Sequence, residues 1–228
     1  MIIYGKQVCL YALTKHEASI NTVYIAKKGI LPQKLYDRYK DRIKFLENKW
    51  AQSMAKGGNH QGILVEMAEC APSGLSNMKQ NDFVLVLDGL TDAGNIGAIV
   101  RTAYALGVDG IIATGIKQLN LAAVTRTSSG ALLDMPFAVI PNILDVLNEL
   151  KQIDFNVYGA AMEGTPVEQS VFHKKRVLVL GSEGEGISKR AKTKIDQMIS
   201  IAMQREFDSL NVSAAGAILI HRMSNAVQ

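Results

Sequence analysis

The sequence predicts an α/β protein whose larger part is built on a mostly parallel sheet. Short apolar runs of strand type alternate along the chain with segments of helical periodicity, a pattern typical of parallel sheets covered by helices on both faces. A turn-rich stretch at residues 69–80 separates two such series, and hydrophobic residues make up 48% of the 228-residue chain, enough for a core in each. We therefore expect a small α/β domain at residues 1–68, a linker at 69–80 and a larger α/β domain at 81–228.

The expected elements follow from the apolar periodicity. In the first domain we expect a helix at 4–14, a strand at 22–26, a basic helix at 32–50 and a strand at 63–67. In the second we expect strands at 83–88, 110–114, 137–140, 157–160, 177–180 and 199–203, with helices at 96–106, 144–153 and 210–223. Ligands of such sheets bind at the carboxyl ends of the strands. The turns after Asp88 and Leu180 lie at such ends.

The surplus of positive charge lies entirely in the N-terminal part. Residues 1–68 hold 11 Lys and Arg against 5 Asp and Glu, whereas residues 69–228 hold 14 against 16. We therefore expect the first domain to meet an anionic partner, with nucleic acid as the leading candidate and a membrane surface as the weaker one. The basic residues of 27–49 are interleaved with Tyr36, Tyr39, Phe45 and Trp50. This pattern suits an RNA surface and, equally, a solvated helix that buries its aromatic residues.

The cysteine content and the lengths of the apolar runs indicate the cellular compartment of this protein. Cys9 and Cys70 are far apart in sequence, and no His, Cys and carboxylate cluster has metal-ligand spacing. The first residues lack a signal-peptide pattern, and no apolar run approaches the ~20 residues that span a bilayer. We expect a cytoplasmic protein with no metal and no membrane association.

The turn after Asp88 leads through glycines into a helix. We expect Asn95 to be the N-cap of that helix, along which apolar residues recur at helical spacing. Gly97 and Arg101 lie one turn apart, so the glycine leaves space beside the guanidinium. An ordinary strand, turn and capped helix explains this segment about as well as a functional site does.

Two further segments carry polar groups next to strand ends. Residues 181–186 read Gly-Ser-Glu-Gly-Glu-Gly after an apolar strand. The glycines bring backbone close to a ligand, the two carboxylates argue against a phosphate, and a flexible surface turn is the plainer interpretation. Ser209 and Asn211 precede a helix of small residues. Helix capping explains either of them, but not both together with the small residues.

Taken in order, these three segments resemble the SpoU (TrmH) family of RNA ribose 2′-O-methyltransferases. The matching residues are 92–97 with Arg101, then 180–186, then 199–203 through 209–213. Residues 3–5 and 60–63 are similar to the N-terminal substrate-binding domain of bacterial members that methylate a guanosine of 23S ribosomal RNA. The resemblance therefore extends over the whole chain.

The resemblance implies a C-terminal parallel-sheet domain with a deep trefoil knot, which forms a homodimer, and a small N-terminal α/β domain that binds RNA. It also implies methyl transfer from S-adenosylmethionine to the ribose 2′-hydroxyl of a guanosine in 23S ribosomal RNA. The family's catalytic positions fall on Asn95, Arg101, Glu183, Ser209 and Asn211. Its cofactor-binding positions fall on Gly181, Ile201, Met203 and Leu210.

The role of Arg101 and the identity of the RNA have alternatives. The family's arginine is often made the general base, but an arginine side chain stays protonated, so we favour a clamp on the adjacent phosphate that also stabilises the developing alkoxide. A transfer-RNA ribose methyltransferase of the same family is the first alternative function, and the N-terminal domain argues against its simplest versions. A non-catalytic RNA-binding protein on the same scaffold is the second. The joint presence of Asn95, Arg101, Glu183 and Asn211 argues against it.

Overall fold

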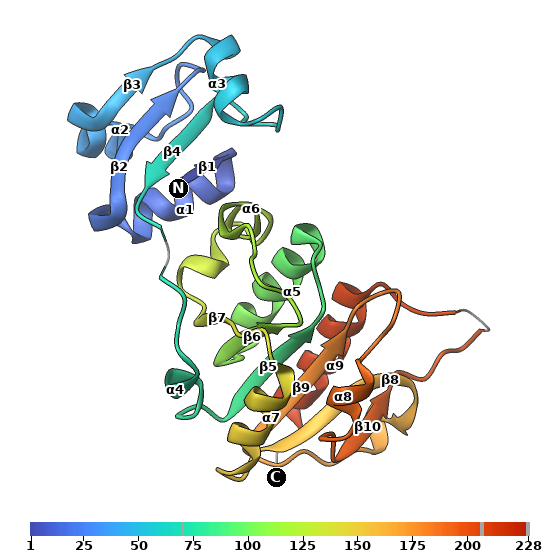
Figure 1. Ribbon diagram of the computed structural model, residues 1–228. Helices are drawn as coiled ribbons and strands as arrows, with labels where there is room; N and C mark the ends of the chain where they lie inside the picture. Colours follow the sequence, from blue (N-terminus) through green and yellow to red (C-terminus); the bar gives the residue numbers. More distant parts are fainter. Residues whose placement is uncertain (70, 206–207, 227–228) are drawn as a thin grey trace. The chain divides into compact units, whose positions relative to one another are not determined.

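The computed structural model describes residues 1–69, 71–205 and 208–226, and the chain divides into two compact units (Figure 1). The N-terminal unit comprises Met1–Ala71 and Asn120–Leu133, and the C-terminal unit comprises Pro72–Leu119 and Asp134–Gln228. The chain therefore passes between the units three times, whereas the sequence predicts one passage. Residue 70 of the expected linker lies outside the described residues.

The N-terminal unit is a four-stranded sheet with helices. Its strand order is β1-β4-β2-β3, and β2 and β3 are its parallel pair. The strands are β1 (Ile2–Tyr4), β2 (Ile20–Ile25), β3 (Ile43–Phe45) and β4 (Ile63–Met67). The helices are α1 (Lys6–Lys15), α2 (Gln33–Tyr39), α3 (Asn48–Met54) and α6 (Leu121–Thr127), with 3-10 turns at Glu17–Ser19, Lys40–Arg42 and Ala131–Leu133. Cys9 is fully buried in the core, and this burial raises the pKa of its thiol.

The expected basic helix at 32–50 is wrong. The helix α2 ends at Tyr39, whose buried hydroxyl donates to the Leu13 carbonyl at 2.9 Å. The chain then forms the edge strand β3, in which Phe45 pairs with Ile25. The interpretation as a solvated helix that buries its aromatic residues is wrong, because Tyr39 is buried while Tyr36, Phe45 and Trp50 are exposed, and the RNA surface stays a prediction. At the start of this unit Tyr4, which we expected in the first helix, belongs to β1, and α1 begins at Lys6.

The segment Asn120–Leu133, which follows the second strand of the C-terminal sheet, packs in the N-terminal unit. Its helix α6 contacts β1, and the Arg126 guanidinium lies over the Tyr4 ring at 5.1 Å from the centroid. A Cβ on Gly130 would lie 2.7 Å from Tyr11, so only glycine fits at this contact. Helix α6 was not predicted from the sequence.

The C-terminal unit confirms the expected parallel sheet. Its six strands have the order β10-β8-β9-β5-β6-β7, and every neighbouring pair is parallel. They are β5 (Phe83–Asp88), β6 (Gly110–Thr114), β7 (Phe137–Val139), β8 (Asn156–Pro166), β9 (Arg176–Gly181) and β10 (Gln197–Ser200). The last expected strand, at 199–203, thus ends at Ser200. All six residues of β5 are buried, as its continuous apolar run predicts.

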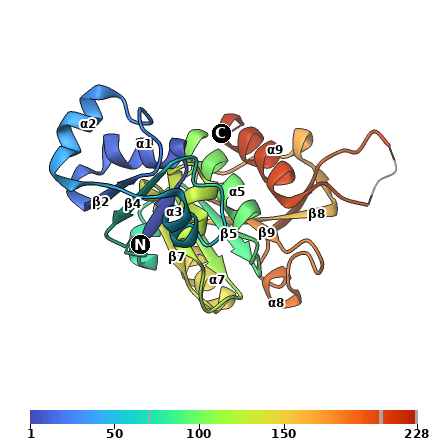
Figure 2. The same cartoon turned by 90° about the horizontal axis from the view of Figure 1, so that it is seen from above.

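Helices cover both faces of this sheet, as expected. Figure 2 shows α5 (Ala93–Ala105) and α9 (Val212–Asn225) on one face, with α7 (Ile143–Lys151) and α8 (Lys189–Lys192) on the other. Val84 and Val86 of β5 pack in the core that α7 closes with Val146 and Leu147. The short α4 (Leu75–Met78), α8 and the 3-10 turn Val167–Gln169 were not anticipated from the sequence. Among the described residues no helix is long and apolar enough to cross a membrane.

Candidate functional site

The two glycine-rich turns meet at the carboxyl end of the sheet. Strands β5 and β9 are neighbours in parallel register, with Asp88 opposite Gly181. The Asp88 carboxylate is buried and accepts a hydrogen bond of 2.8 Å from the Ser188 backbone N–H. Asp88, the last residue before the turn after β5, therefore contacts the loop after β9 at its beginning, Gly181, and just beyond its end, Ser188.

The loop after β9 is folded tightly. Ser182 and Gly186 exchange two backbone hydrogen bonds, of 3.2 Å and 2.9 Å, and Gly186 has a φ of +65°. A Cβ on Gly181 would lie 2.0 Å from the Gly186 carbonyl carbon, so residue 181 accepts no side chain. This close approach presents the two carboxylates of the loop, Glu183 and Glu185, on its exposed tip.

Asp92, not Asn95, caps α5. The Asp92 carboxylate accepts a 2.7 Å hydrogen bond from the Asn95 backbone N–H, which places Asn95 inside the first turn of the helix. The expectation that Asn95 is the N-cap is wrong, because an aspartate three residues earlier already satisfies that backbone donor. The Asn95 side chain is therefore available for other hydrogen bonds.

Three segments far apart in sequence bring their polar side chains together. The Asn95 amide donates to Glu183 Oε1 at 3.0 Å. The Asn211 amide donates to the same oxygen at 2.9 Å and to Asn95 Oδ1 at 3.0 Å. We call Asn95, Glu183 and Asn211 the amide–carboxylate cluster. Charge-assisted hydrogen bonds of this kind hold a carboxylate in one orientation.

Asn211 contributes both ends of its side chain. Its oxygen caps α9 by accepting from the Ser213 backbone N–H at 2.9 Å and from the Ser213 hydroxyl at 2.6 Å, while its nitrogen donates within the cluster. Helix α9 begins at Val212, two residues later than expected. Asn211 is therefore the N-cap of α9, and Ser209 does not cap this helix.

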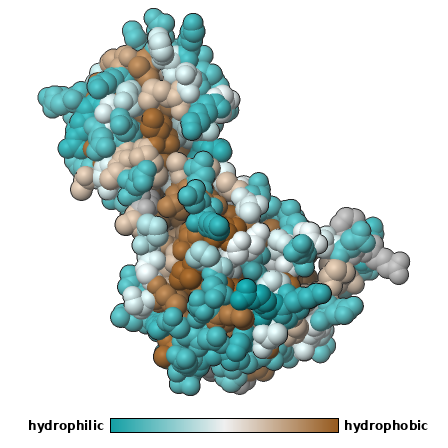
Figure 3. Space-filling view, in the orientation of Figure 1, coloured by the Kyte–Doolittle hydropathy of each residue, from teal (hydrophilic) through white to brown (hydrophobic). Residues whose placement is uncertain are grey.

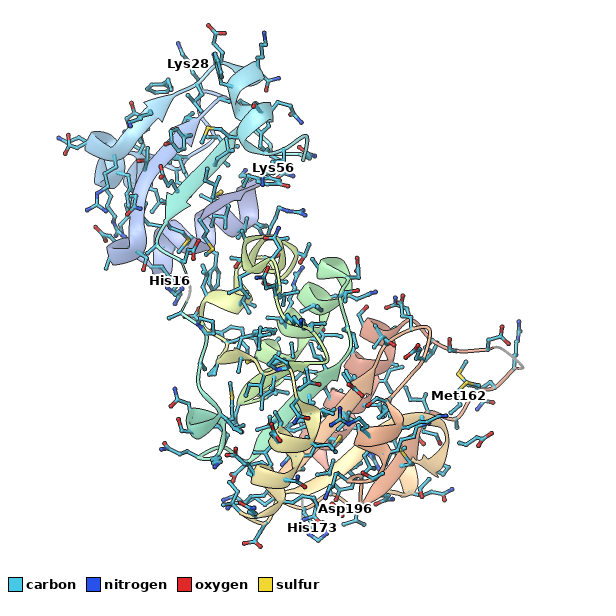
Figure 4. The ribbon with its side chains drawn as sticks, viewed as in Figure 1. His16, Lys28, Lys56, Met162, His173 and Asp196 are labelled. Atoms are coloured by element: carbon cyan, nitrogen blue, oxygen red, sulfur yellow. The ribbon has the colours of Figure 1, made fainter. Side chains whose placement is uncertain are left out.

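A pocket of about 870 Å³ lies beside the amide–carboxylate cluster. It is lined by Glu183, Ser209 and Asn211 of the expected catalytic residues, and by all the expected cofactor-binding residues, Gly181, Ile201, Met203 and Leu210. It is also lined by Ala160, Ala161 and Met162 of β8, which were not among the predicted site residues. Figure 4 labels Met162, whose side chain is exposed on β8. The position of these residues at the end of an expected strand was the signal that could have found them.

Arg101 and Asn95 do not line this pocket. Asn95 is tied to it through Glu183 and Asn211, whereas Arg101 is exposed on α5, more than one turn further along. No group of three His, Cys, Asp or Glu residues suited to a metal ion occurs in the part of the chain that the structure describes. The site therefore offers carboxylate, amide and hydroxyl groups around an apolar pocket.

Solved structures share this fold over nearly the whole chain. The SpoU methyltransferase AviRb from Streptomyces viridochromogenes, in complex with the cofactor AdoMet, superposes with a TM-score of 0.79 at 20% identity, covering 99% of this chain and 89% of that one. An AdoMet-bound rRNA methyltransferase from Sinorhizobium meliloti gives a TM-score of 0.77 at 20% identity, covering 98% and 86%. At this identity the likeness shows the fold alone.

Family models and relatives cover both parts of the chain. Residues 82–221 match the SpoU rRNA Methylase family, and residues 2–72 match RNA 2'-O ribose methyltransferase substrate binding. A relative from Pasteurella multocida, named 23S rRNA (guanosine-2'-O-)-methyltransferase RlmB, is 35% identical over 78% of this chain and 76% of its own length. The protein of the same name from Neisseria meningitidis is 28% identical over 96% and 92%. The chain therefore belongs to the SpoU rRNA methylase family.

Proposed function

We propose that this protein transfers a methyl group from S-adenosylmethionine to the ribose 2′-hydroxyl of a guanosine in 23S ribosomal RNA. The observation that carries the proposal is the amide–carboxylate cluster at the edge of the pocket, built from the three segments on which the family resemblance rests. Relatives that match over three quarters or more of their length are named for this activity.

The pocket residues fit S-adenosylmethionine. The volume of about 870 Å³ lies within the range of roughly 300–1,000 Å³ typical of small-molecule sites. Met162, Met203 and Leu210 line the pocket with exposed side chains and offer an apolar surface for the adenine ring, and the backbone at Ile201 and Ala202 offers hydrogen-bonding groups. The Glu183 carboxylate in the wall suits the donor's positive charge.

The chain's residues have two tasks in this reaction. Bound S-adenosylmethionine supplies a methyl group activated by the sulfonium charge. The protein must align the hydroxyl oxygen with that methyl group and assist loss of the hydroxyl proton. We assign alignment to the amide–carboxylate cluster, whose members restrain one another, and to the Ser209 hydroxyl in the pocket wall.

We assign Arg101 to the RNA side of the site. An arginine carries its positive charge throughout the physiological pH range, so it binds a phosphate and stabilises a developing alkoxide without giving up a proton. Its exposed position on α5, the helix that also carries Asn95, supports this assignment over that of a general base.

We propose that residues 1–68 bind the RNA, that 69–80 act as a linker and that 81–228 carry the methyl transfer. The match of residues 2–72 to a substrate-binding model and the basic surplus of this part support the division.

Because ribosomal RNA is the substrate, we place the reaction in the cytoplasm. We also propose that the protein is a homodimer formed through the C-terminal unit, and sedimentation of a fully active monomer would refute this.

We propose further that the C-terminal unit contains a deep trefoil knot. Strand β10 lies at one edge of the sheet, yet α9 packs on α5 and β9 nearer its middle. The chain between them must return past the loop after β9, and Asn211 contacts Glu183 of that loop at 2.9 Å. A crystal structure in which residues 201–211 pass outside that loop contradicts the knot.

Two measurements test the proposed function. Titration calorimetry with S-adenosylmethionine tests the pocket, and methyl transfer to 23S ribosomal RNA from a strain that lacks the gene tests the reaction. We expect saturable donor binding and one new 2′-O-methylguanosine in the RNA. Methylation of transfer RNA instead would identify the alternative substrate, and donor binding without transfer to either RNA would refute the proposal.

A further inference from the structure

A second hollow lies in the N-terminal unit, at the carboxyl ends of its two parallel strands. Strands β2 and β3 place Ile25 opposite Phe45, and the loop after β2 leads into α2. The hollow has a volume of about 340 Å³, and its lining includes Ile25, Lys28, Leu31, Tyr36 and Phe45. Figure 4 places Lys28 at this end of the unit. Ligands of parallel strands bind at such ends.

The hollow has an apolar floor between exposed aromatic side chains. Ile25 and Leu31 are buried, whereas Tyr36 is 37% and Phe45 59% exposed. The Leu46 backbone N–H donates to the Ile25 carbonyl at 2.9 Å, so the strand end that carries Phe45 is held in place. Single exposed aromatic residues need no explanation. Two that line one hollow form a surface for a flat, unsaturated ring.

The surroundings of this hollow are basic. Residues 25–50 contain eight Lys and Arg against three Asp and Glu. Arg38 pairs with Glu17 at 3.5 Å, and Arg42 donates to the Ile20 carbonyl at 2.9 Å, so both guanidinium groups are used within the fold. Six lysines of the segment are exposed, namely Lys27, Lys28, Lys34, Lys40, Lys44 and Lys49. Figure 3 shows hydrophilic side chains over much of this unit's surface.

We propose that this hollow holds one unpaired base of the RNA substrate, stacked on Phe45 and Tyr36, with the Lys28 ammonium beside the adjoining phosphate. The identity of that RNA as the methylation substrate rests on the proposed function. Aromatic side chains bind bases that are splayed out of single-stranded loops and bulges, whereas bases inside a duplex are stacked on each other and out of reach. The site therefore selects an unpaired nucleotide.

The test uses the full-length protein and an RNA oligonucleotide of a loop-forming 23S segment that carries 2-aminopurine, a base whose fluorescence falls on stacking. Phe45→Leu keeps the apolar bulk and removes the aromatic face, whereas Phe45→Tyr keeps that face. Trp50→Leu is the matched control, because Trp50 is an aromatic residue of the same unit that is 63% exposed and does not line the hollow. Tyr36→Leu is a second variant of the hollow itself.

We expect Phe45→Leu to weaken RNA binding by about tenfold, a loss of the size found when one base–aromatic stack is removed. Phe45→Tyr and Trp50→Leu should bind as the wild type does, and quenching of 2-aminopurine should disappear with Phe45→Leu alone among these three. Thermal unfolding checks that each variant is folded. Because Phe45 is mostly exposed, its replacement should not change the melting temperature.

Three results would overturn the proposal. These are unchanged binding by both Phe45→Leu and Tyr36→Leu, equal weakening by Phe45→Leu and Trp50→Leu, and equal wild-type affinity for the loop and for a perfect duplex. Donor binding and methyl transfer are measured on the same samples. If RNA binding depends on Phe45 but no methyl group is transferred, the proposed function fails and the base site stands. If the methyl group is transferred but replacing Phe45 has no effect on RNA binding, the base site fails and the proposed function stands.

Discussion

Asn211 Nδ2 and Glu183 Oε1 are joined by a hydrogen bond of 2.9 Å that connects the cap of α9 to the loop after β9. Asn95 donates to the same carboxylate oxygen from the first turn of α5. One carboxylate oxygen thus accepts hydrogen bonds from both α5 and the cap of α9, two segments that also contact each other directly. Removing the Glu183 side chain should therefore have two effects: Asn95 and Asn211 lose the acceptor that orients them, and the site loses a negative charge.

Replacing Glu183 by Gln separates these two effects. Gln keeps an oxygen that accepts both amides but has no negative charge. We expect S-adenosylmethionine to bind about threefold to fivefold more weakly. An ion pair between a carboxylate near solvent and the sulfonium contributes about this factor to the affinity. S-adenosylhomocysteine, which has a neutral sulfur, should bind as it does to the wild type. Titration calorimetry with both compounds measures the difference, and equal weakening of the two would place Glu183 away from the sulfonium.

Gly216 of α9 is buried where this helix packs on β9 and α5. A Cβ at this position would lie 3.1 Å from Leu180 and 3.7 Å from Ile99, within the same chain. The small residues of α9 therefore serve its packing on β9 and α5.

We expect Gly216→Val to destabilise the protein by about 1–3 kcal/mol through overpacking, and to lower the melting temperature by several degrees. Gly216→Ala should stay near wild-type stability, because one methyl group needs little adjustment and Ala favours a helix over Gly by about 1 kcal/mol. The control is Ala214→Val, an exposed position of the same helix, where only the helix propensity changes. Calorimetric melting of the three variants gives the ranking, and a Val variant as stable as the control contradicts this packing role.

The parallel sheet could be predicted because its central strands are continuous apolar runs. Strand β5 reads Phe-Val-Leu-Val-Leu-Asp and is buried on both faces, which leaves little ambiguity. Strand β3 could not be predicted in this way, because Ile43–Phe45 is a three-residue edge strand with a lysine in its middle. Helix α6 was missed since its partner, β1, lies more than 100 residues earlier in the sequence.

The site could be predicted in part. Polar residues after strand ends mark the turns after Asp88 and Leu180, and the rule for parallel sheets places both at one edge. The hydrogen bond between Asn95 and Asn211 spans 116 positions, and no local pattern shows it. The capping error at Asn95 has a local cause, since Asp92 is an equally good cap three residues earlier.

The exposed lysines near the second hollow should set the salt dependence of RNA binding. Each phosphate contact to single-stranded RNA adds about 0.7 to the slope of log K against log salt concentration. We expect Lys28→Gln with Lys44→Gln to reduce the slope by about 1.4 if both lysines contact phosphates. Lys192→Gln, an exposed lysine of α8 in the C-terminal unit, serves as the control. Binding measured from 50 mM to 200 mM salt decides, and an unchanged slope in the double variant excludes these contacts.

Arg101 is the residue on which the assignment of the RNA side depends. It follows Gly97 by one turn on the helix that carries Asn95, and it is exposed. We expect Arg101→Ala to bind S-adenosylmethionine nearly as the wild type does, and to slow single-turnover methylation by about 10² or more, the size of effect seen when a preorganised charge stabiliser is removed.

The variant Arg101→Lys distinguishes a phosphate contact from a role that needs the planar guanidinium. A point charge on a phosphate is partly replaced by an ammonium, so activity returns, whereas a role that needs the planar guanidinium is not rescued. Single-turnover assays with saturating RNA and donor measure both variants, and a wild-type rate for Arg101→Ala would remove Arg101 from the catalytic residues.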